Sequence, residues 1–164
     1  MLSVNKSIVI EETSAAKYKN KFLIHYHDAD KVGPHYDIRI EHNGSLESWA
    51  CRYINRLVKG KTKKILIVRQ PPHKIEWFDF EGEITDGYGK GKIQIWDKGD
   101  VDKIKWDDKT RSYTINFING EKIKGEYHII PYVGKNKKQC LMFKAKKKVQ
   151  TFNNQLSKTH FFKN

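Results

Sequence analysis

The chain has 164 residues, of which 38% are hydrophobic and 12% aromatic, so it has enough apolar material for one folded domain and is not a disordered basic tail. No apolar run approaches the ~20 residues that cross a bilayer as a helix. The formal net charge of +13 favours a polyanionic partner, nucleic acid before an anionic membrane, unless the lysines only keep the protein dissolved.

Residues 1–20 are predicted to form a polar arm, with a candidate short strand at residues 7–10. The arm has neither the long apolar core nor the small-residue cleavage site of a secretory signal, which predicts an intracellular protein. Cys51 and Cys140 do not form a CxxC pair. We therefore expect two buried, reduced thiols, with a single disulfide as the open alternative.

Residues 21–41 are predicted to form two adjacent strands, each with one apolar face. Successive side chains of a strand point to opposite faces, so the apolar residues of each strand separate from the polar ones. The apolar faces carry Phe22, Ile24, Tyr26, Tyr36, Ile38 and Ile40, and the opposite faces carry His25, His27, His35, Asp37, Arg39 and Glu41. Imidazoles, a carboxylate and a guanidinium are the groups that a metal-assisted phosphate site requires.

The alternative for this polar row is a solvated face, which antiparallel strands commonly have. Such a face more often carries Lys, Glu, Thr and Ser. Here three histidines fall within the eleven residues from His25 to His35, and Asp37 follows two residues later. The composition of the row therefore favours the functional interpretation.

Beyond residue 41 the pattern predicts short strands separated by turns, hence an all-β barrel or sandwich. A turn is predicted at 42–44 and a basic loop at 55–64, and Pro71–Pro72 should end a strand before a loop or short strand at 73–80. Four glycines at 82–91 precede a strand that ends at Trp96. The other strands are predicted at 46–53, 64–70, 110–120, 121–133 and 140–147, and the tail from 149 to 164 is a short helix or disordered.

Several other features have two interpretations. The Gly-Tyr-Gly-Lys-Gly run at 87–91 lacks the P-loop pattern and favours a tight turn. His73 has a functional role only if the fold brings it to the histidines and Asp37 of the polar row, which are the candidate metal ligands. The four tryptophans are core residues in the first instance, although one could stack a base. The lysines at 135, 137, 138 and 144–148 could track phosphates or form a solvated face.

Six short strings occur in a fixed order: His-Asp-Ala at 27–29, His-Tyr-Asp-Ile-Arg-Ile-Glu at 35–41, Ser-Trp-Ala at 48–50, Phe-Glu-Gly-Glu-Ile at 80–84, Gly-Tyr-Gly-Lys-Gly at 87–91 and Trp-Asp-Lys-Gly at 96–99. Together they closely resemble the 3′-phosphoesterase domain of bacterial DNA ligase D and its stand-alone relatives. The resemblance implies a compact, closed or nearly closed β-barrel of mostly antiparallel strands at 21–147, between the arm at 1–20 and a short tail at 148–164.

The resemblance also implies that a divalent metal, typically manganese, with zinc or cobalt as alternatives, is held by His27, His35 and Asp37. Arg39 and His73 would bind the phosphate. The family removes a 3′-terminal ribonucleoside and then the 3′-phosphate, leaving a 3′-hydroxyl. Because metal binding needs neutral imidazoles and an ionised carboxylate, activity should fall in acid.

Three residues depart from the family pattern. Trp77 replaces a tyrosine, His25 replaces a glutamine, and Lys64 stands for an arginine if one inserted residue is allowed. The family's Pro and Gly after Ser-Trp-Ala and its N-terminal arm are not recognisable here. These departures leave the predicted metal ligands intact and affect the ribonuclease step and the phosphate contacts.

We expect His73, Arg39 and Glu41 to be catalytic. Arg39 would bind the phosphate, in a bidentate way if the geometry allows. His73, when protonated, would assist the leaving alkoxide, and Glu41 would orient Arg39 or a metal-bound histidine. His25 could be a further ligand, a support for a neighbour or a substrate contact, and Trp77 and Lys64 are candidate substrate-binding residues.

The expected partners are DNA or RNA 3′ ends at primer–template junctions or nicked duplexes, with a ligase or polymerase acting in trans on a monomeric protein. One alternative is a basic barrel that binds nucleic acid without catalysis. Another is a 3′-end enzyme directed to RNA, since the sequence does not separate DNA from RNA. A membrane-surface role ranks third, because no basic amphipathic helix is visible.

Overall fold

The computed structural model describes residues 15–134 and 136–146. The strands are β1 (Lys21–Ala29), β2 (Gly33–His42), β3 (Ser45–Cys51), β4 (Lys64–Lys74), β5 (Gly82–Ile84), β6 (Gly91–Asp107), β7 (Ser112–Ile118), β8 (Gly125–Pro131) and β9 (Gln139–Lys144). The predicted strand at 7–10 and most of the predicted arm and tail lie outside the described residues. No helix within 15–134 and 136–146 is long and apolar enough to span a membrane.

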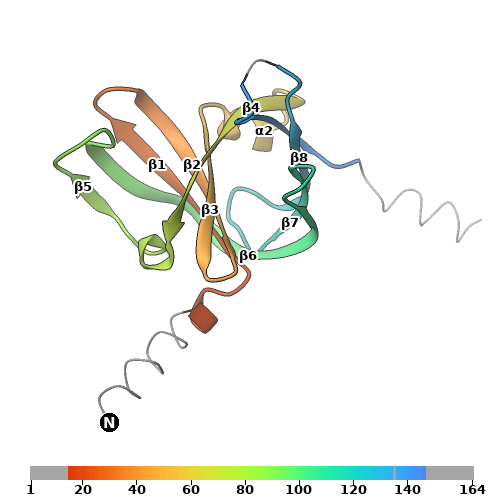
Figure 1. Cartoon of the computed structure of the whole chain (residues 1–164), viewed down its shortest axis with the longest axis horizontal. Helices are drawn as coiled ribbons and strands as arrows, with labels where there is room; N and C mark the ends of the chain where they lie inside the picture. Colours follow the sequence, from red (N-terminus) through yellow and green to blue (C-terminus); the bar gives the residue numbers. More distant parts are fainter. Residues whose placement is uncertain (1–14, 135, 147–164) are drawn as a thin grey trace, which may run out of the picture.

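The strands form a closed antiparallel barrel (Figure 1). Eight strands follow one another in the order β1-β2-β3-β4-β9-β8-β7-β6, and pairing of β1 with β6 closes the ring. The short strand β5 is added outside the ring on β6. The prediction of an all-β, closed, antiparallel barrel is confirmed.

The two faces of β1 and β2 pack against different parts of the molecule. Phe22, Ile24, Ile38 and Ile40 belong to the main core inside the barrel. Leu23, on the opposite face of β1, packs in a second cluster with Leu46, Ile75 and Phe78. The polar row shares this outer face, which is covered by the segment between β4 and β6, so it becomes buried without entering the barrel core.

Three details of the predicted strand pattern are wrong. Residues 55–64 are not only a loop, because the short helix α2 (Ile54–Val58) opens this region, where Ile54 and Leu57 are buried in the main core. β6 does not end at Trp96 but continues to Asp107, because β7 becomes its partner from Asp100 onward.

The third error concerns Pro71 and Pro72, which do not end β4. The pairing of β4 with β9 stops at Val68. No backbone carbonyl of β9 is therefore paired with the prolines, and the N–H group that they lack is not needed on that side. On the other side they fall at a register shift between Leu46 and Ser48 of β3. Proline is tolerated at bulges and edges, since the missing N–H is not needed there. β4 therefore continues to Lys74 and includes His73, and a 3-10 turn, η1 (Ile75–Trp77), follows.

The two predicted thiols are free and buried, Cys51 at the end of β3 and Cys140 on β9. Asp97 of the Trp-Asp-Lys-Gly string is buried as well, and its carboxylate accepts the backbone N–H groups of Glu121, Lys122 and Ile123. This string therefore anchors the β7–β8 connection to β6.

Candidate metal and phosphate site

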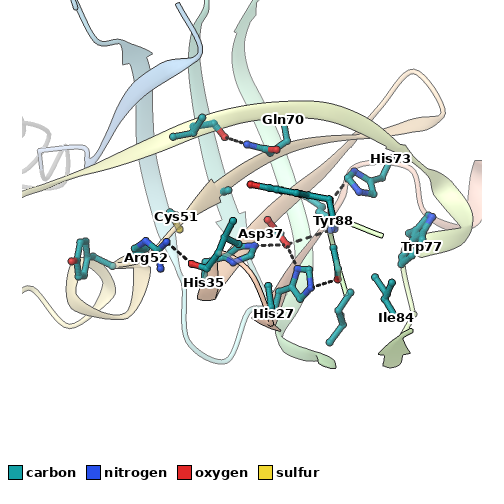
Figure 2. A pocket seen from close by; sticks show the side chains of 18 of the residues that line it. His27, His35, Asp37, Cys51, Arg52, Gln70, His73, Trp77, Ile84 and Tyr88 are labelled. Atoms are coloured by element: carbon teal, nitrogen blue, oxygen red, sulfur yellow. Dashed lines mark hydrogen bonds and ion pairs between the residues drawn. The ribbon is translucent and has the colours of Figure 1, made fainter. Parts of the chain in front are cut away.

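Two facing histidines and a carboxylate meet on the outer face of β1 and β2. His27 on β1 is the register partner of His35 on β2, and Asp37 follows two residues later on the same face. One Asp37 oxygen, Oδ2, lies 3.6 Å from His27 Nδ1 and 3.5 Å from His35 Nε2. The three candidate ligand atoms lie within 4.8 Å of one another (Figure 2). Alternation and register thus bring the predicted metal ligands together.

Backbone carbonyls select the tautomer of each histidine. His27 Nε2 lies 2.7 Å from the Gly89 carbonyl and His35 Nδ1 lies 3.0 Å from the Gly33 carbonyl. A carbonyl only accepts, so these nitrogens donate and the opposite nitrogens, His27 Nδ1 and His35 Nε2, keep their lone pairs toward Asp37. Metal-bound histidines are commonly oriented in this way by a partner on the other ring nitrogen.

The site keeps Asp37 ionised. Burial opposes the charge, but the hydrogen bonds that His27 and His35 donate when they are protonated, together with the positive charge of Arg39, outweigh it and hold the pKa of Asp37 below its usual range. The same carboxylate raises the pKa of His35, mainly because it accepts a hydrogen bond from the protonated ring. An anionic Asp37 between two imidazoles attracts a cation, either a proton or a metal ion.

The three groups fit a divalent metal. Ligand atoms about 2.1 Å from an ion lie roughly 3.0–3.4 Å apart in octahedral or tetrahedral geometry. The Asp37–His27 and Asp37–His35 separations of 3.6 and 3.5 Å are close to this range, and the three atoms, which lie within 4.8 Å of one another, would draw together around an ion. Two imidazoles and one carboxylate accept several divalent ions and leave positions for substrate or water, so the set does not choose manganese over zinc or cobalt.

Arg39 lies at the centre of the polar row and is almost fully buried. Its Nε donates to His25 Nδ1, and Nη1 donates to Ser48 Oγ and His73 Nδ1, all at 3.0 Å. Nη2 lies 3.5 Å from Asp37 Oδ2. Since Nε and Nη1 are engaged within the protein, Nη2 is the end of the guanidinium that is available to a phosphate oxygen. Arg39 is thus arranged for end-on rather than bidentate binding.

His25 supports Arg39. Its Nε2 donates to the Phe80 carbonyl at 2.8 Å, and its Nδ1 accepts from Arg39. Burial and then the Arg39 charge lower the pKa of His25 to about 4, so the ring is neutral at neutral pH. With both nitrogens engaged, His25 takes the supporting role among the three that the sequence left open.

The fold brings His73 to the metal row, because β4 continues past the prolines. His73 Nδ1 accepts from Arg39, so the ring proton of neutral His73 is on Nε2. Burial and the nearby Arg39 charge lower the pKa of His73. Trp77 stands beside it, with ring centroids 5.9 Å apart in an edge-to-face arrangement. His73 and Trp77 both line the cavity that contains the metal row.

Two predicted site residues lie elsewhere. The Glu41 carboxylate accepts the backbone N–H groups of Asn20 and Gly44, so it closes the β2–β3 turn, and Arg39 is oriented by His25 and Ser48 instead of the predicted Glu41. Lys64 opens β4 with its Nζ over the Phe143 ring and is not among the residues lining the cavity. It shares a face of β4 with Leu66, which does line the cavity.

The cavity measures about 490 Å³ and contains residues that the sequence did not single out. Ser48, the register partner of Arg39, is fully buried and does not line the cavity, but its hydroxyl accepts from the guanidinium. Tyr88, from the glycine run, lines the cavity and is 70% exposed. Both belong to the strings that carry the family resemblance, so membership of these strings is the sequence feature that could have identified them as site residues. The glycine run is a turn as expected, but its Gly89 carbonyl also orients His27.

Comparison with known proteins agrees with this geometry. A family model described as the DNA ligase D 3′-phosphoesterase domain matches residues 25–131, which include all three candidate metal ligands, Arg39 and His73. The chain belongs to this family. The relatives that it matches are much longer proteins, and the chain is similar to one part of each of them.

A multifunctional non-homologous end joining protein LigD from Mycobacterium bovis is 38% identical over 113 residues, covering 68% of this chain and 14% of that protein. Proteins of the same description from Mycolicibacterium smegmatis and Pseudomonas aeruginosa are each 34% identical, over 71% and 67% of this chain and 16% and 13% of those proteins. The chain thus spans about one seventh of the length of these relatives.

Proposed function

We propose that this chain is a divalent-metal-dependent 3′-phosphoesterase that processes nucleic-acid 3′ ends for DNA repair. The observation that carries the proposal is the convergence of the His27–His35–Asp37 group with Arg39 Nη2 and His73 on one cavity. Family membership gives the reaction class, and the relatives, which are described as end-joining and DNA-repair proteins, give the context.

The proposed reaction is hydrolysis of a 3′-phosphate. Water attacks phosphorus, the bond between phosphorus and O3′ breaks, and inorganic phosphate and a 3′-hydroxyl result. A divalent ion held by His27, His35 and Asp37 would supply positive charge to the phosphate oxygens. Phosphoryl transfer depends mainly on such charge stabilisation and on positioning.

Arg39 and His73 would position the phosphate beside the metal ligands. Arg39 Nη2 would donate to one phosphate oxygen, and the other donors of the guanidinium keep it in place. With its lowered pKa and its Nδ1 accepting from Arg39, His73 would act as a neutral donor through Nε2–H. This differs from the expectation of a protonated histidine, because a second positive charge beside Arg39 is unfavourable.

The test is phosphate release from a 3′-phosphorylated primer–template, with and without Mn²⁺, beside a substrate that ends in one ribonucleotide. Asp37→Asn should abolish release, whereas Asp102→Asn, at an exposed site on β6, should not change it. Thermal melting of both variants controls for folding. Release from the wild-type protein that is independent of metal, or full activity of Asp37→Asn, would contradict the proposal.

The same assay separates the alternatives. Release from the 3′-phosphate alone would mean that the ribonuclease step is absent. A matched RNA 3′-phosphate that reacts faster than the DNA one would indicate an RNA-directed enzyme. Tight binding without any release would indicate a nucleic-acid-binding barrel that lacks catalysis.

A further inference from the structure

The two sides of the cavity carry opposite charge. Residues 52–74 contain eight Lys or Arg and no Asp or Glu, whereas residues 75–89 contain five Asp or Glu and no Lys or Arg. The change of sign falls after Lys74, the residue that follows His73. Neither the metal row nor the phosphate contacts require this separation, since each uses residues from the floor of the cavity.

Both segments border the cavity. Arg52 and Tyr53 line it immediately before α2, and Leu66, Val68 and Gln70 line it from β4. The segment made of α2 and the loop to β4 therefore lies between two lining residues, Tyr53 before it and Leu66 after it. On the other side the lining residues are Trp77, Ile84 and Tyr88, which belong to the acidic segment. Figure 2 shows Arg52 on one side of the Asp37 carboxylate and Trp77 and Ile84 on the other.

The cations around the α2–β4 loop are available to a ligand. We define the basic ridge as Arg56, Lys59, Lys61 and Lys63, all of which are exposed. In the part of the chain that the structure describes, none of the four has a carboxylate partner within ion-pair distance. By contrast, Asp79 on the acidic side is already bonded to Tyr18 and paired with Lys98.

We infer that the nucleic-acid strand leading to the reacting 3′ end leaves the cavity across the basic ridge and not across β5. The inference rests on the proposed function, which places a terminal phosphate at the metal row. The next phosphates of the strand must then cross one of the two rims. A polyanion is attracted by an unpaired cationic rim and repelled by the acidic one, so the direction of the strand follows from the charge.

The first test is the salt dependence of binding. Lys61→Gln with Lys63→Gln should weaken binding of a 3′-phosphorylated dodecamer and lower the slope of log K against log salt by about 1.5, since each phosphate contact contributes roughly 0.7–0.9. Lys19→Gln with Lys105→Gln is the control, because both lysines are exposed and neither lines the cavity. Equal slopes for the ridge variant and the wild type would overturn the inference, as would an equal loss in the control.

Turnover distinguishes this inference from the proposed function. The ridge variant should raise KM for the dodecamer several-fold and leave kcat/KM for a 3′-phosphorylated dinucleotide unchanged. A photoreactive base four nucleotides from the 3′ end should crosslink to residues 54–64, and crosslinking to residues 79–86 would overturn the inference. Binding and crosslinking do not require hydrolysis, so they test the path of the strand even if the wild type releases no phosphate.

Discussion

His25 should make the stability of this protein depend strongly on pH, and a single substitution should remove that dependence. His25 is fully buried between the Arg39 guanidinium and the Phe80 carbonyl, accepting from the first and donating to the second. Glutamine has one acceptor and one donor at its end, so His25→Gln can keep both hydrogen bonds but cannot take up a proton. It is also the residue that the family usually has at this position.

The magnitude follows from the pKa, which is lowered from 6.5 to about 4. Above pH 6.5 the ring is neutral in both states, and the full stability is present. As the pH falls from 6.5 to 4, the unfolded chain takes up a proton that the folded protein excludes, so the free energy of unfolding decreases. A shift of this size corresponds to roughly 3 kcal/mol in total, of which about 2 kcal/mol is lost between pH 7 and 5.

The assay is urea denaturation of the wild type and His25→Gln at several pH values from 7.5 to 4.5, with a chelator to remove metal ions. The difference between the two proteins isolates His25 from the other titrating groups. His25→Gln should lose about 2 kcal/mol less than the wild type between pH 7 and 5 and should retain metal-dependent activity. Parallel curves for the two proteins would refute the buried, neutral state assigned to His25.

Three further predictions follow from other contacts. Asp97→Asn should lower the free energy of unfolding by about 2–4 kcal/mol in denaturation experiments, because its buried carboxylate accepts four backbone N–H groups, three of them from the β7–β8 connection. The exposed Asp102→Asn should change it by less than about 0.5 kcal/mol. Saturating Mn²⁺, at about 100 times its Kd, should stabilise the wild type by about 2.7 kcal/mol, and this gain should vanish in Asp37→Ala; equal thermal shifts in both proteins would place the metal elsewhere. Ser48→Ala removes one of the acceptors that hold Arg39, so it should lower kcat/KM for a 3′-phosphorylated end about tenfold while metal affinity, measured by titration, stays unchanged.

The sequence by itself determined the strands that carry the site. Side-chain alternation has a period of two residues, so it is a local property that separates His27, His35, Asp37 and Arg39 from the apolar face without knowledge of the fold. The ordered strings added His73 through the family resemblance. The register of β1 with β2, which makes His27 face His35, follows from the short turn between the two strands.

Only the tertiary structure decided how these side chains are used. Pro71 and Pro72 predict the end of a strand, but the end of the β4–β9 pairing at Val68 and the bulge in β3 let β4 carry His73 to Arg39. The supporting roles of His25, Gly89 and Glu41 likewise depend on groups up to 62 residues away. Such contacts arise only when distant strands pair and the β4–β6 segment covers the outer face, which no local pattern specifies.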